Sequence, residues 1–440
     1  MKTLLVATAL AAIPIVVSPE GLSYGEGSLK GLDYRQGSGE PQSWQQWGGP
    51  RRNFMVDAPA LADSWPQSGP RKLWERAVGE GHSAILADGN RLYTMYRYAG
   101  LLSMIRRTQA ETIAAIDATT GKTLWEKTYD SATGGLDLEY GAGPHSTPLM
   151  VGDTLYAIGS RTELFALDKN TGRVIWQHNL VNEYGVPQEG RGYSPSPTPY
   201  RDTIILPGGK GASLIAFNQA TGAVVWKAGD YPLGVASPLL IKVDGQDQLV
   251  VSGANEILGV DPANGTVLWR HPHKTDWGLN ISTPVWGPDN LLFASAAYNN
   301  GARLLNLTQA AGKTNVKEQW YQNRMRVHIG TAIRLGDFVV GSNGDFGPCP
   351  TVAIDVKTGE ILWQNRDFAR STFLHADGKL IILDEDGTLG LAVPTRQDLN
   401  VKARASVLTS KAWTTPTLAG TKLYVRDRVK MMAFELGKQR

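Results

Sequence analysis

The side chains best suited to binding or catalysis in this sequence lie just ahead of a recurring Ser/Thr-Pro motif. Histidine, arginine and aromatic residues predominate there. Arginine forks bind carboxylates through paired hydrogen bonds, and aromatic rings stack on planar groups. If the chain brings these segments together, they could hold a small anionic or planar ligand; the alternative is a polar rim bonded to neighbouring loops. The candidate binding residues are His82, His145, Arg191, Tyr193, Trp277, Asn280, Arg326, His328, Lys411 and Trp413.

The sequence gives little evidence for a catalytic site or a metal site. Three histidines from separate segments would have to meet within about 2 Å of one ion to bind a metal, so we expect no metal site. The run Asp384-Glu385-Asp386-Gly387 lacks the remaining ligands of a calcium loop and predicts a hairpin turn. The only cysteine, Cys349, lies between two prolines and predicts a packed thiol without catalytic role. The sequence assigns no catalytic residue.

An internal repeat predicts the elements that position these segments. Aspartate or asparagine caps backbone N–H groups at a turn entrance, and glycine takes the positive φ that a tight turn requires. A unit that contains a capping aspartate or asparagine and a turn glycine, flanked by alternating apolar residues, predicts a β-hairpin. A small residue, a glycine six positions later and a tryptophan four positions after that recur with identical spacing at Ala115/Gly121/Trp125, Ala166/Gly172/Trp176, Ala216/Gly222/Trp226, Gly259/Gly265/Trp269 and Ala353/Gly359/Trp363.

The tryptophan of each unit is expected to pack between adjacent units. A fixed offset from the turn places every indole alike, and burial of an indole removes about 150–250 Å² of surface from water. Two further members deviate, because Trp320 follows an insertion in its turn and Trp74 lacks the preceding strand. Val407 stands where an eighth tryptophan is expected. The predicted docking residues are Trp74, Trp125, Trp176, Trp226, Trp269, Trp320 and Trp363.

Counting these positions gives eight units spaced by 43 to 51 residues. Four strands per unit at this period predict an all-β fold, an eight-bladed β-propeller of four-stranded antiparallel blades over residues 71–440. The strand of Trp74 lacks its hairpin partner, and the strand at 429–435 lacks its tryptophan. We therefore expect the two termini to complete one blade together, which removes open sheet edges. In such a ring the candidate binding residues surround one mouth of the axial channel.

The N-terminus predicts export. Lys2 is followed by an apolar stretch from Leu4 to Val17, which suits a signal peptide within residues 1–23 and is shorter than a membrane span; the cleavage point stays open, and an apolar strand is the alternative. Residues 24–70 predict an extension that is flexible at first and then strapped onto the propeller. We expect a periplasmic or secreted monomer. We expect no lipid anchor, because no cysteine follows the apolar stretch. A formal charge of +3 indicates no nucleic-acid partner.

The repeat resembles the tryptophan-docking unit of pyrroloquinoline-quinone-type (PQQ-like) propellers over residues 72–436. That family contains quinoprotein alcohol dehydrogenases and the propeller lipoprotein of the outer-membrane β-barrel assembly machinery, a binding scaffold without a cofactor. The dehydrogenases of that family share an adjacent cysteine pair beside the quinone, so the resemblance implies such a pair for a dehydrogenase. A chain whose only cysteine is Cys349 cannot supply it. No Cys-x-x-Cys-His motif for haem is present either. Trp47-Gly48-Gly49-Pro50-Arg51 and Lys411-Ala412-Trp413-Thr414-Thr415-Pro416 look more like short exported members of the family.

Two functions follow from the resemblance and its departures. The first is a non-catalytic scaffold that binds a protein partner or a small ligand through its axial mouth and blade edges, with no cofactor. The alternative is a PQQ-dependent alcohol or sugar dehydrogenase of a reduced type, in which Arg191, Arg326 and Trp413 grip the acidic, planar quinone and calcium accompanies it.

Overall fold

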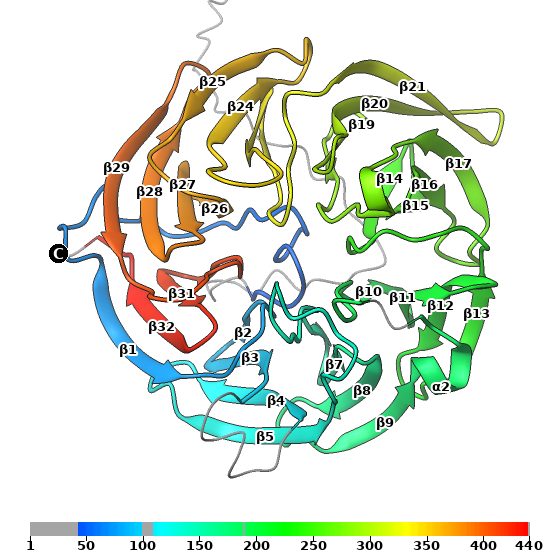
Figure 1. Cartoon of the computed structure of the whole chain (residues 1–440), viewed down its shortest axis with the longest axis horizontal. Coiled ribbons are helices and arrows are strands. Elements are labelled where there is room, and N and C mark those ends of the chain that lie inside the picture. Colours follow the sequence, from blue (N-terminus) through cyan, green and yellow to red (C-terminus); the bar gives the residue numbers. More distant parts are fainter. Residues whose placement is uncertain (1–42, 99–108, 188–189, 439–440) are drawn as a thin grey trace, which may run out of the picture.

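The computed structural model describes residues 43–98, 109–187 and 190–438. Eight antiparallel sheets of four strands each surround a central axis, so the prediction of an all-β, eight-bladed propeller is confirmed (Figure 1). The helical segments in this part of the chain are α2 (Leu180–Tyr184) and the 3-10 turn η1 (Asp276–Gly278). No helix in the described ranges is long and apolar enough to cross a membrane. The expected signal peptide and residues 24–42 of the extension lie outside the described residues.

The first four blades follow one another along the chain, each beginning at its innermost strand. Blade 1 contains β2 (Leu86–Asp88), β3 (Arg91–Tyr96), β4 (Ala110–Asp117) and β5 (Thr123–Asp130). Blade 2 contains β6 (Leu149–Val151), β7 (Thr154–Ile158), β8 (Glu163–Asp168) and β9 (Val174–Asn179). Blade 3 contains β10 (Thr198–Tyr200), β11 (Thr203–Gly209), β12 (Ala212–Asn218) and β13 (Val224–Ala228). Blade 4 contains β14 (Leu239–Val243), β15 (Gln246–Ser252), β16 (Glu256–Val260) and β17 (Val267–Pro272).

The remaining blades complete the circle, and the last one joins both ends of the chain. Blade 5 contains β18 (Val285–Trp286), β19 (Leu291–Ala296), β20 (Gly301–Ala310) and β21 (Lys313–Gln322). Blade 6 contains β22 (Ile333–Leu335), β23 (Phe338–Ser342), β24 (Thr351–Asp355) and β25 (Ile361–Asn365). Blade 7 contains β26 (Ser371–Ala376), β27 (Lys379–Asp384), β28 (Thr388–Pro394) and β29 (Leu399–Ser406). Blade 8 contains β30 (Thr417–Ala419), β31 (Lys422–Arg426), β32 (Lys430–Glu435) and, as its outermost strand, β1 (Arg71–Ala77).

The strand order gives the ring two distinct faces. Loops that lead into the innermost strands open on one face, which we call the mouth face. Turns between the third and fourth strands of each blade lie on the opposite face, the far face. At the first of these turns Asp117 Oδ1 accepts hydrogen bonds from the backbone N–H groups of Thr119 and Thr120, at 3.0 and 2.7 Å, and Gly121 has φ +71°. The sequence prediction of a capped hairpin with a glycine turn holds at this site.

Tryptophan side chains reach from one blade to the far-face turn of the next. The indole N–H of Trp125 donates to the carbonyl of Lys169 at 2.9 Å, and its ring covers Gly172, where a Cβ would lie 2.6 Å from the indole. Glycine is therefore required both by its positive φ and by the close approach of the ring. The same donation to the next blade joins Trp74 to Ala118, Trp176 to Gln219, Trp320 to Val356 and Trp363 to Thr395, and Trp226 packs on Gly265.

Two positions depart from this pattern. Trp269 donates to Gln248 Oε1 of its own blade at 2.7 Å, because the following blade carries the long β20–β21 hairpin, whose Gly312 turn is displaced outward. Its ring still lies in a core cluster shared with blade 5. The expectation that Val407 marks the eighth tryptophan position is wrong: the strand shift of blade 7 aligns Ala403 with the other tryptophans, and β29 ends before Val407.

The Ser/Thr-Pro motif links neighbouring blades at the axis. The backbone N–H of Thr147 donates to Ser196 Oγ at 3.0 Å, and that of Ser196 donates to Ser237 Oγ at 2.9 Å. Thr147 Oγ1 in turn accepts from Ala84 N at 3.0 Å. Each hydroxyl thus satisfies a buried N–H group of the preceding blade, which explains why this residue recurs ahead of the innermost strand.

An N-terminal segment, residues 44–61, crosses the far face and closes the channel there. Trp44 pairs with Ala87 and Met55 pairs with His375, both near the far ends of innermost strands. In Figure 1 this segment, in blue, runs across the centre of the ring. The described part of the extension is therefore strapped onto the propeller, over the axis itself.

Two side chains of this segment enter the channel. Arg52 is 8% exposed and donates to Gln46 Oε1, Thr198 Oγ1 and the Pro238 carbonyl at 2.9–3.1 Å. Trp47 donates to Thr283 Oγ1 at 3.1 Å. These bonds reach blades 3, 4 and 5, so the segment acts as a plug that ties several blades together.

Candidate functional site: the axial cavity

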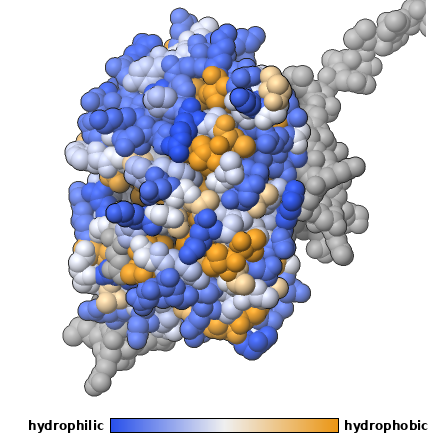
Figure 2. Space-filling model, turned by 90° about the vertical axis from the view of Figure 1, so that its right-hand side faces the viewer, coloured by the Kyte–Doolittle hydropathy of each residue, from blue (hydrophilic) through white to orange (hydrophobic). Residues whose placement is uncertain are grey.

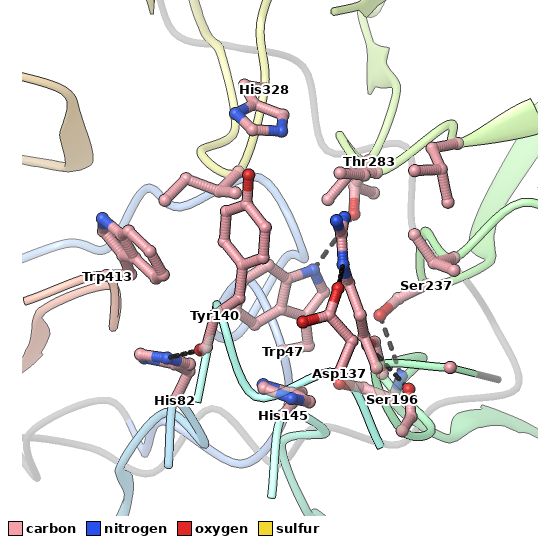
Figure 3. Close-up of a pocket in the computed structure, with 18 of the residues that line it drawn as sticks. Trp47, His82, Asp137, Tyr140, His145, Ser196, Ser237, Thr283, His328 and Trp413 are labelled. Atoms are coloured by element: carbon pink, nitrogen blue, oxygen red, sulfur yellow. Dashed lines mark hydrogen bonds and ion pairs between the residues drawn. The ribbon is translucent and has the colours of Figure 1, made fainter. Parts of the chain in front are cut away.

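A cavity of about 370 Å³ lies on the axis below the mouth face. Trp47 of the plug forms its floor, so the cavity is closed toward the far face. Figure 3 shows Trp413 and His82 on one side of Trp47, and Thr283 and Ser237 on the other. Loops from seven blades thus converge on one chamber, which the repeat geometry predicts for residues ahead of the innermost strands.

One wall of the cavity is a cluster of rings. The imidazoles of His82 and His145 stack with centroids 5.5 Å apart, and His82 lies 5.2 Å from Trp413. Tyr140 packs 5.6 Å from Trp413 on its other side, and the Arg191 guanidinium lies 4.3 Å above the tyrosine ring. His82 is fixed by its Nε2, which donates to the Tyr140 carbonyl at 2.9 Å. The wall is therefore preformed, and its rings pack on one another and on the Arg191 guanidinium.

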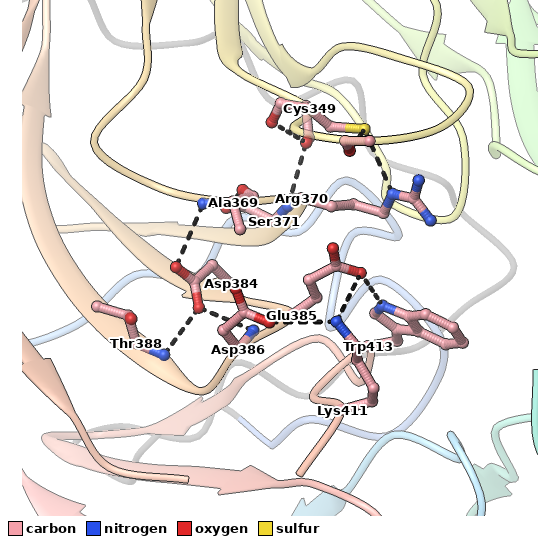
Figure 4. A network of polar contacts seen from close by, with 12 residues as sticks. Cys349, Ala369, Arg370, Ser371, Asp384, Glu385, Asp386, Thr388, Lys411 and Trp413 are labelled. Carbon is pink, nitrogen blue, oxygen red and sulfur yellow. Dashed lines mark hydrogen bonds and ion pairs between the residues drawn. The ribbon is translucent and has the colours of Figure 1, made fainter. Parts of the chain in front are cut away.

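The hairpin turn between β27 and β28 holds Trp413 in place. Asp384 Oδ1 accepts from the backbone N–H groups of Asp386 and Thr388, at 3.1 and 2.8 Å, and these hydrogen bonds order the turn. Glu385 in this turn accepts the indole N–H of Trp413 at 2.9 Å and lies 3.6 Å from the Lys411 ammonium (Figure 4). The expectation of a hairpin at this acidic run is confirmed, and the turn orients one wall of the cavity.

Aliphatic side chains and a Tyr–His pair also line the cavity. Ile281 and Ile329 line it, together with the Tyr298–His328 pair, in which the tyrosine hydroxyl lies 2.5 Å from Nε2 of the imidazole. His328 is 2% exposed, and its ring meets the Tyr298 ring edge to face at 4.8 Å. The cavity lining thus combines aromatic and aliphatic side chains, as small-molecule sites commonly do.

The histidines of the cavity are uncharged at neutral pH. Burial lowers the pKa of His145 to about 4 and that of His328 to about 3, because a charged imidazole would lose its hydration there. Burial also holds the pKa of His82 well below its ordinary value, and the neighbouring His145 adds to this effect. Arg191 is the one cation among the described lining residues, and it pairs with Asp137 at 3.2 Å. The lining therefore carries no net charge.

Five of the ten candidate residues meet in this cavity: His82, His145, Arg191, His328 and Trp413. The other five serve elsewhere on the same face. Tyr193 is buried and donates to the Pro207 carbonyl at 2.8 Å. Asn280 is buried and donates to the carbonyls of Gly253 and His273. Trp277, Arg326 and Lys411 lie on the rim, where Trp277 is 73% exposed, Arg326 pairs with Asp345 and Lys411 pairs with Asp386.

Sequence reasoning missed several residues of the cavity, among them Trp47, Asp137, Tyr140 and Tyr298. Asp137 and Tyr140 lie in the long loop at 131–148, several residues ahead of the Thr-Pro motif. Tyr298 belongs to the β19–β20 turn, which also opens on the mouth face. The Trp-Gly-Gly-Pro segment around Trp47 stood out in the sequence, but nothing in its spacing indicated that it enters the channel.

Pyrroloquinoline quinone does not fit these residues. An acidic, planar cofactor needs cations, yet Arg191 is already neutralised by Asp137, and Arg326 pairs with Asp345 at 3.2 Å outside the cavity. Within the described ranges no group of three His, Cys, Asp or Glu side chains is placed to hold a metal ion. Cys349 has no cysteine neighbour and accepts from Arg370 Nε at 3.4 Å.

A closed ring of eight four-stranded blades with tryptophans lying over glycine turns defines the chain as a PQQ-like repeat propeller. Residues 109–365 match the sequence model of the family described as outer membrane protein assembly factor BamB. This match covers more than half of the chain, and the chain belongs to that family.

Curated relatives are of two kinds. BamB of Yersinia pestis is 23% identical over 385 residues, which cover 82% of this chain and 88% of that protein. Quinoprotein alcohol dehydrogenase PedH of Pseudomonas putida is 29% identical over 151 residues, which cover 30% of this chain and 23% of the enzyme. The chain thus matches less than a quarter of the dehydrogenase, whereas its match to BamB runs over most of both chains.

Solved structures agree on the fold. BamB from Moraxella catarrhalis superposes with a TM-score of 0.59 at 16% identity, covering 85% of this chain and 99% of that one. Quinohemoprotein alcohol dehydrogenase from Comamonas testosteroni gives a TM-score of 0.50 at 13% identity, covering 91% and 81%. At these identities the likeness shows the propeller fold alone.

Proposed function

We propose that the protein is an exported, non-catalytic propeller that binds partner proteins through its mouth face and its blade edges. The match to BamB along most of the chain supports this scaffold role over that of a quinone-dependent dehydrogenase. Export is supported by the apolar stretch Leu4 to Val17 behind Lys2. The proposal includes a monomer without a lipid anchor, cofactor or nucleic-acid partner.

The observation that carries the proposal is an exposed aromatic cluster on the mouth face. Trp277 is 73% exposed and Phe346 is 65% exposed, although both are large apolar side chains. Tyr298 lies between them, 5.1 Å from the Trp277 ring and 6.1 Å from the Phe346 ring. Aromatic residues gathered on a surface are typical of protein interfaces, where they supply much of the binding energy.

The blade edges offer a second apolar series. Leu124, Ile175 and Val225 each precede the tryptophan of their blade and are 42–53% exposed on the outermost strands β5, β9 and β13. Because the three blades are consecutive, these side chains form a repeated apolar row around the rim. Figure 2 shows apolar patches among polar surface on the side of the ring that carries β13 and β17.

Several polar groups in and beside the cavity are paired, whereas His145 Nε2 and His328 Nδ1 are buried without a hydrogen-bond partner among the described residues. Arg191 pairs with Asp137, Trp413 with Glu385 and Tyr298 with His328. A general base would need a free acceptor with a pKa near the working pH, and the cavity histidines have pKa values far below it.

Site-specific photo-crosslinking in the exporting cell tests the proposal. A photoreactive phenylalanine analogue is placed at Trp277 or Phe346 on the mouth face, at Leu124 on a blade edge, and at Lys122 in a far-face turn as the matched control. We expect discrete crosslinked products from the mouth and edge positions and none from Lys122. Absence of products at all three test positions, or identical products from Lys122, would refute the scaffold role.

A further inference from the structure

A groove of about 550 Å³ opens on the mouth rim where blade 6 meets blade 5 in the ring (Figure 1). The segment that leads into β22 lines it with Arg324 and Arg326, and the β23–β24 loop lines it with Asp345 and Phe346. Arg324 and Phe346 are exposed. Phe346 also belongs to the exposed aromatic cluster around Trp277, so the groove and the cluster form one continuous surface. We call this surface the rim groove.

Contacts between its loops hold the rim groove in shape. The backbone N–H of Gly344 donates to the Arg326 carbonyl at 2.9 Å, and the backbone N–H of Arg326 donates to Asn343 Oδ1 at 2.6 Å. Asp345 Oδ2 accepts from the Arg326 guanidinium at 3.2 Å and from the backbone N–H of Asn299 at 3.4 Å. These hydrogen bonds join the two loops to each other and to the β19–β20 turn of blade 5. A preformed groove loses less conformational entropy when a partner binds.

The aromatic side of the rim groove carries backbone strain. Trp277 has φ +68°, and Tyr298 and Asn299 have φ +54° and +64°. This left-handed region is unfavourable for residues other than glycine. Trp277 is held there while its side chain lies in water, so it contributes little to folding. A strained and exposed tryptophan is typical of a binding surface.

The charges of the rim groove favour an anionic partner. Arg326 pairs with Asp345, whereas no ion pair joins Arg324 to a carboxylate among the residues that the structure describes. On the aromatic side, the exposed Lys274 and Asp276 carry opposite charges that offset each other. The groove therefore carries an unbalanced positive charge at Arg324. The arginine fork binds a carboxylate through paired hydrogen bonds.

We infer that the rim groove binds an acidic peptide segment of a partner protein, with an apolar side chain packed on the Trp277 and Phe346 rings and a carboxylate paired with Arg324. The inference rests on the proposed binding function and names the chemistry of the partner at that surface. A basic segment would be repelled by Arg324, and an acidic segment without an apolar side chain would leave both rings in water.

Binding is measured by calorimetric titration of the purified full chain at pH 7.5 with four capped peptides. The acidic phenylalanine peptide is Gly-Ser-Glu-Phe-Glu-Ser-Gly. The glutamine and lysine peptides replace both glutamates, and the acidic alanine peptide replaces the phenylalanine. We expect saturable 1:1 binding of the acidic phenylalanine peptide, with the other three weaker by about tenfold or more. Added salt should weaken this binding, because it screens the attraction to Arg324.

Charge reversal assigns the carboxylate to Arg324. Arg324→Glu should weaken binding of the acidic phenylalanine peptide by about tenfold or more and should make the lysine peptide the better ligand. Arg173→Glu reverses another exposed arginine, in a far-face turn of blade 2, and should leave the order of the peptides unchanged. A reversed preference for charge cannot arise from partial unfolding, so this readout is independent of any loss of stability.

Truncation of the rings tests the apolar contact. Phe346→Ala and Trp277→Ala should each weaken binding of the acidic phenylalanine peptide by about fivefold or more and should leave that of the acidic alanine peptide unchanged. Leu124→Ala removes an exposed apolar side chain from a blade edge and should affect neither peptide. Thermal unfolding of each free variant identifies any loss of folding.

The inference would be overturned if the acidic phenylalanine peptide did not bind to the wild-type chain, if the glutamine or lysine peptide bound as tightly, or if Arg324→Glu and Arg173→Glu had equal effects. Equal binding of the acidic alanine peptide would also overturn it, because it would indicate a general attraction for anions. Such a failure is separable from failure of the scaffold role, because crosslinks from Trp277, Phe346 and Leu124 form with a partner of any charge.

Discussion

The two faces of the ring are built in different ways. On the far face each regular turn repeats one arrangement, in which a carboxylate or amide caps the backbone and a glycine lies under the indole of the preceding blade. On the mouth face the loops differ in length and composition, and their side chains meet in one cavity. The repeated face closes and stabilises the ring, while the varied face is free to recognise ligands. Substitutions on the far face should therefore reduce stability, and those on the mouth rim should not.

The largest effect is expected at the closing blade. Trp74 is 9% exposed and donates to Ala118 across the junction between the chain ends and blade 1. Trp74→Ala should lower the free energy of unfolding by about 3–5 kcal/mol through the cavity and the lost hydrogen bond. Trp277→Ala on the mouth rim should change it by less than about 0.5 kcal/mol. Denaturant unfolding measures both, and equal losses would break the contrast between the faces.

The plug offers a pair of adjacent arginines. Arg52 is buried with hydrogen bonds to three residues, while Arg51 forms an exposed ion pair with Asp57 at 3.0 Å. Arg52→Met should cost about 2–3 kcal/mol, because it removes the buried hydrogen bonds to Gln46, Thr198 and the Pro238 carbonyl. Arg51→Met should cost at most about 1 kcal/mol. Comparable unfolding midpoints for the two variants would contradict the role of the plug.

Two glycines of blade 2 separate backbone strain from the contact with tryptophan. Gly172 and Gly152 both have positive φ, at +71° and +56°, but a Cβ at Gly172 would meet the Trp125 ring at 2.6 Å and one at Gly152 would meet nothing within 4 Å. Gly152→Ala should cost about 1–2 kcal/mol through φ alone. Gly172→Ala should cost about 1–3 kcal/mol more. Denaturant unfolding of both variants measures the two losses in free energy of unfolding. Equal losses would mean that packing of the indole does not require glycine at this position.

Acidification should lower the free energy of unfolding through His145 on the mouth face. The pKa of His145 falls from the ordinary 6.5 to about 4 on folding, so between these values the unfolded chain binds a proton that the native protein does not. Stability should consequently decrease as the pH falls below about 6.5, and His145→Gln should make this decrease shallower. Thermal unfolding from pH 7.5 to 4.5 provides the measurement. A slope that is unchanged in His145→Gln would show that this imidazole is accessible to protons in the native state.

The sequence predicted the ring better than the cavity, for physical reasons. A hairpin turn is a local structure, so the spacing from Gly121 to Trp125 was enough to indicate a blade. Strand shifts are not local, and the alignment of Ala403 rather than Val407 with the other tryptophans depends on the bulge opposite Leu391. The number of blades was unaffected by that error.

The cavity depends on how loops fold over the axis. His82 and Trp413 lie close ahead of their innermost strands, so their convergence was predictable from the repeat. Tyr140 reaches the cavity from the middle of a long loop, and Trp47 arrives from outside the repeats. Their positions follow from packing between blades, for which a single sequence carries no spacing signal.

The central claim is that the mouth serves binding without quinone chemistry. Its most direct test is thermal unfolding of the full chain with and without pyrroloquinoline quinone and calcium, together with an assay of dye reduction with alcohols and sugars. The account predicts an unchanged unfolding temperature and no reduction of the dye. A saturable stabilisation, which would reach about 2.7 kcal/mol at a hundredfold excess over Kd, or dye reduction that requires the quinone, would contradict it.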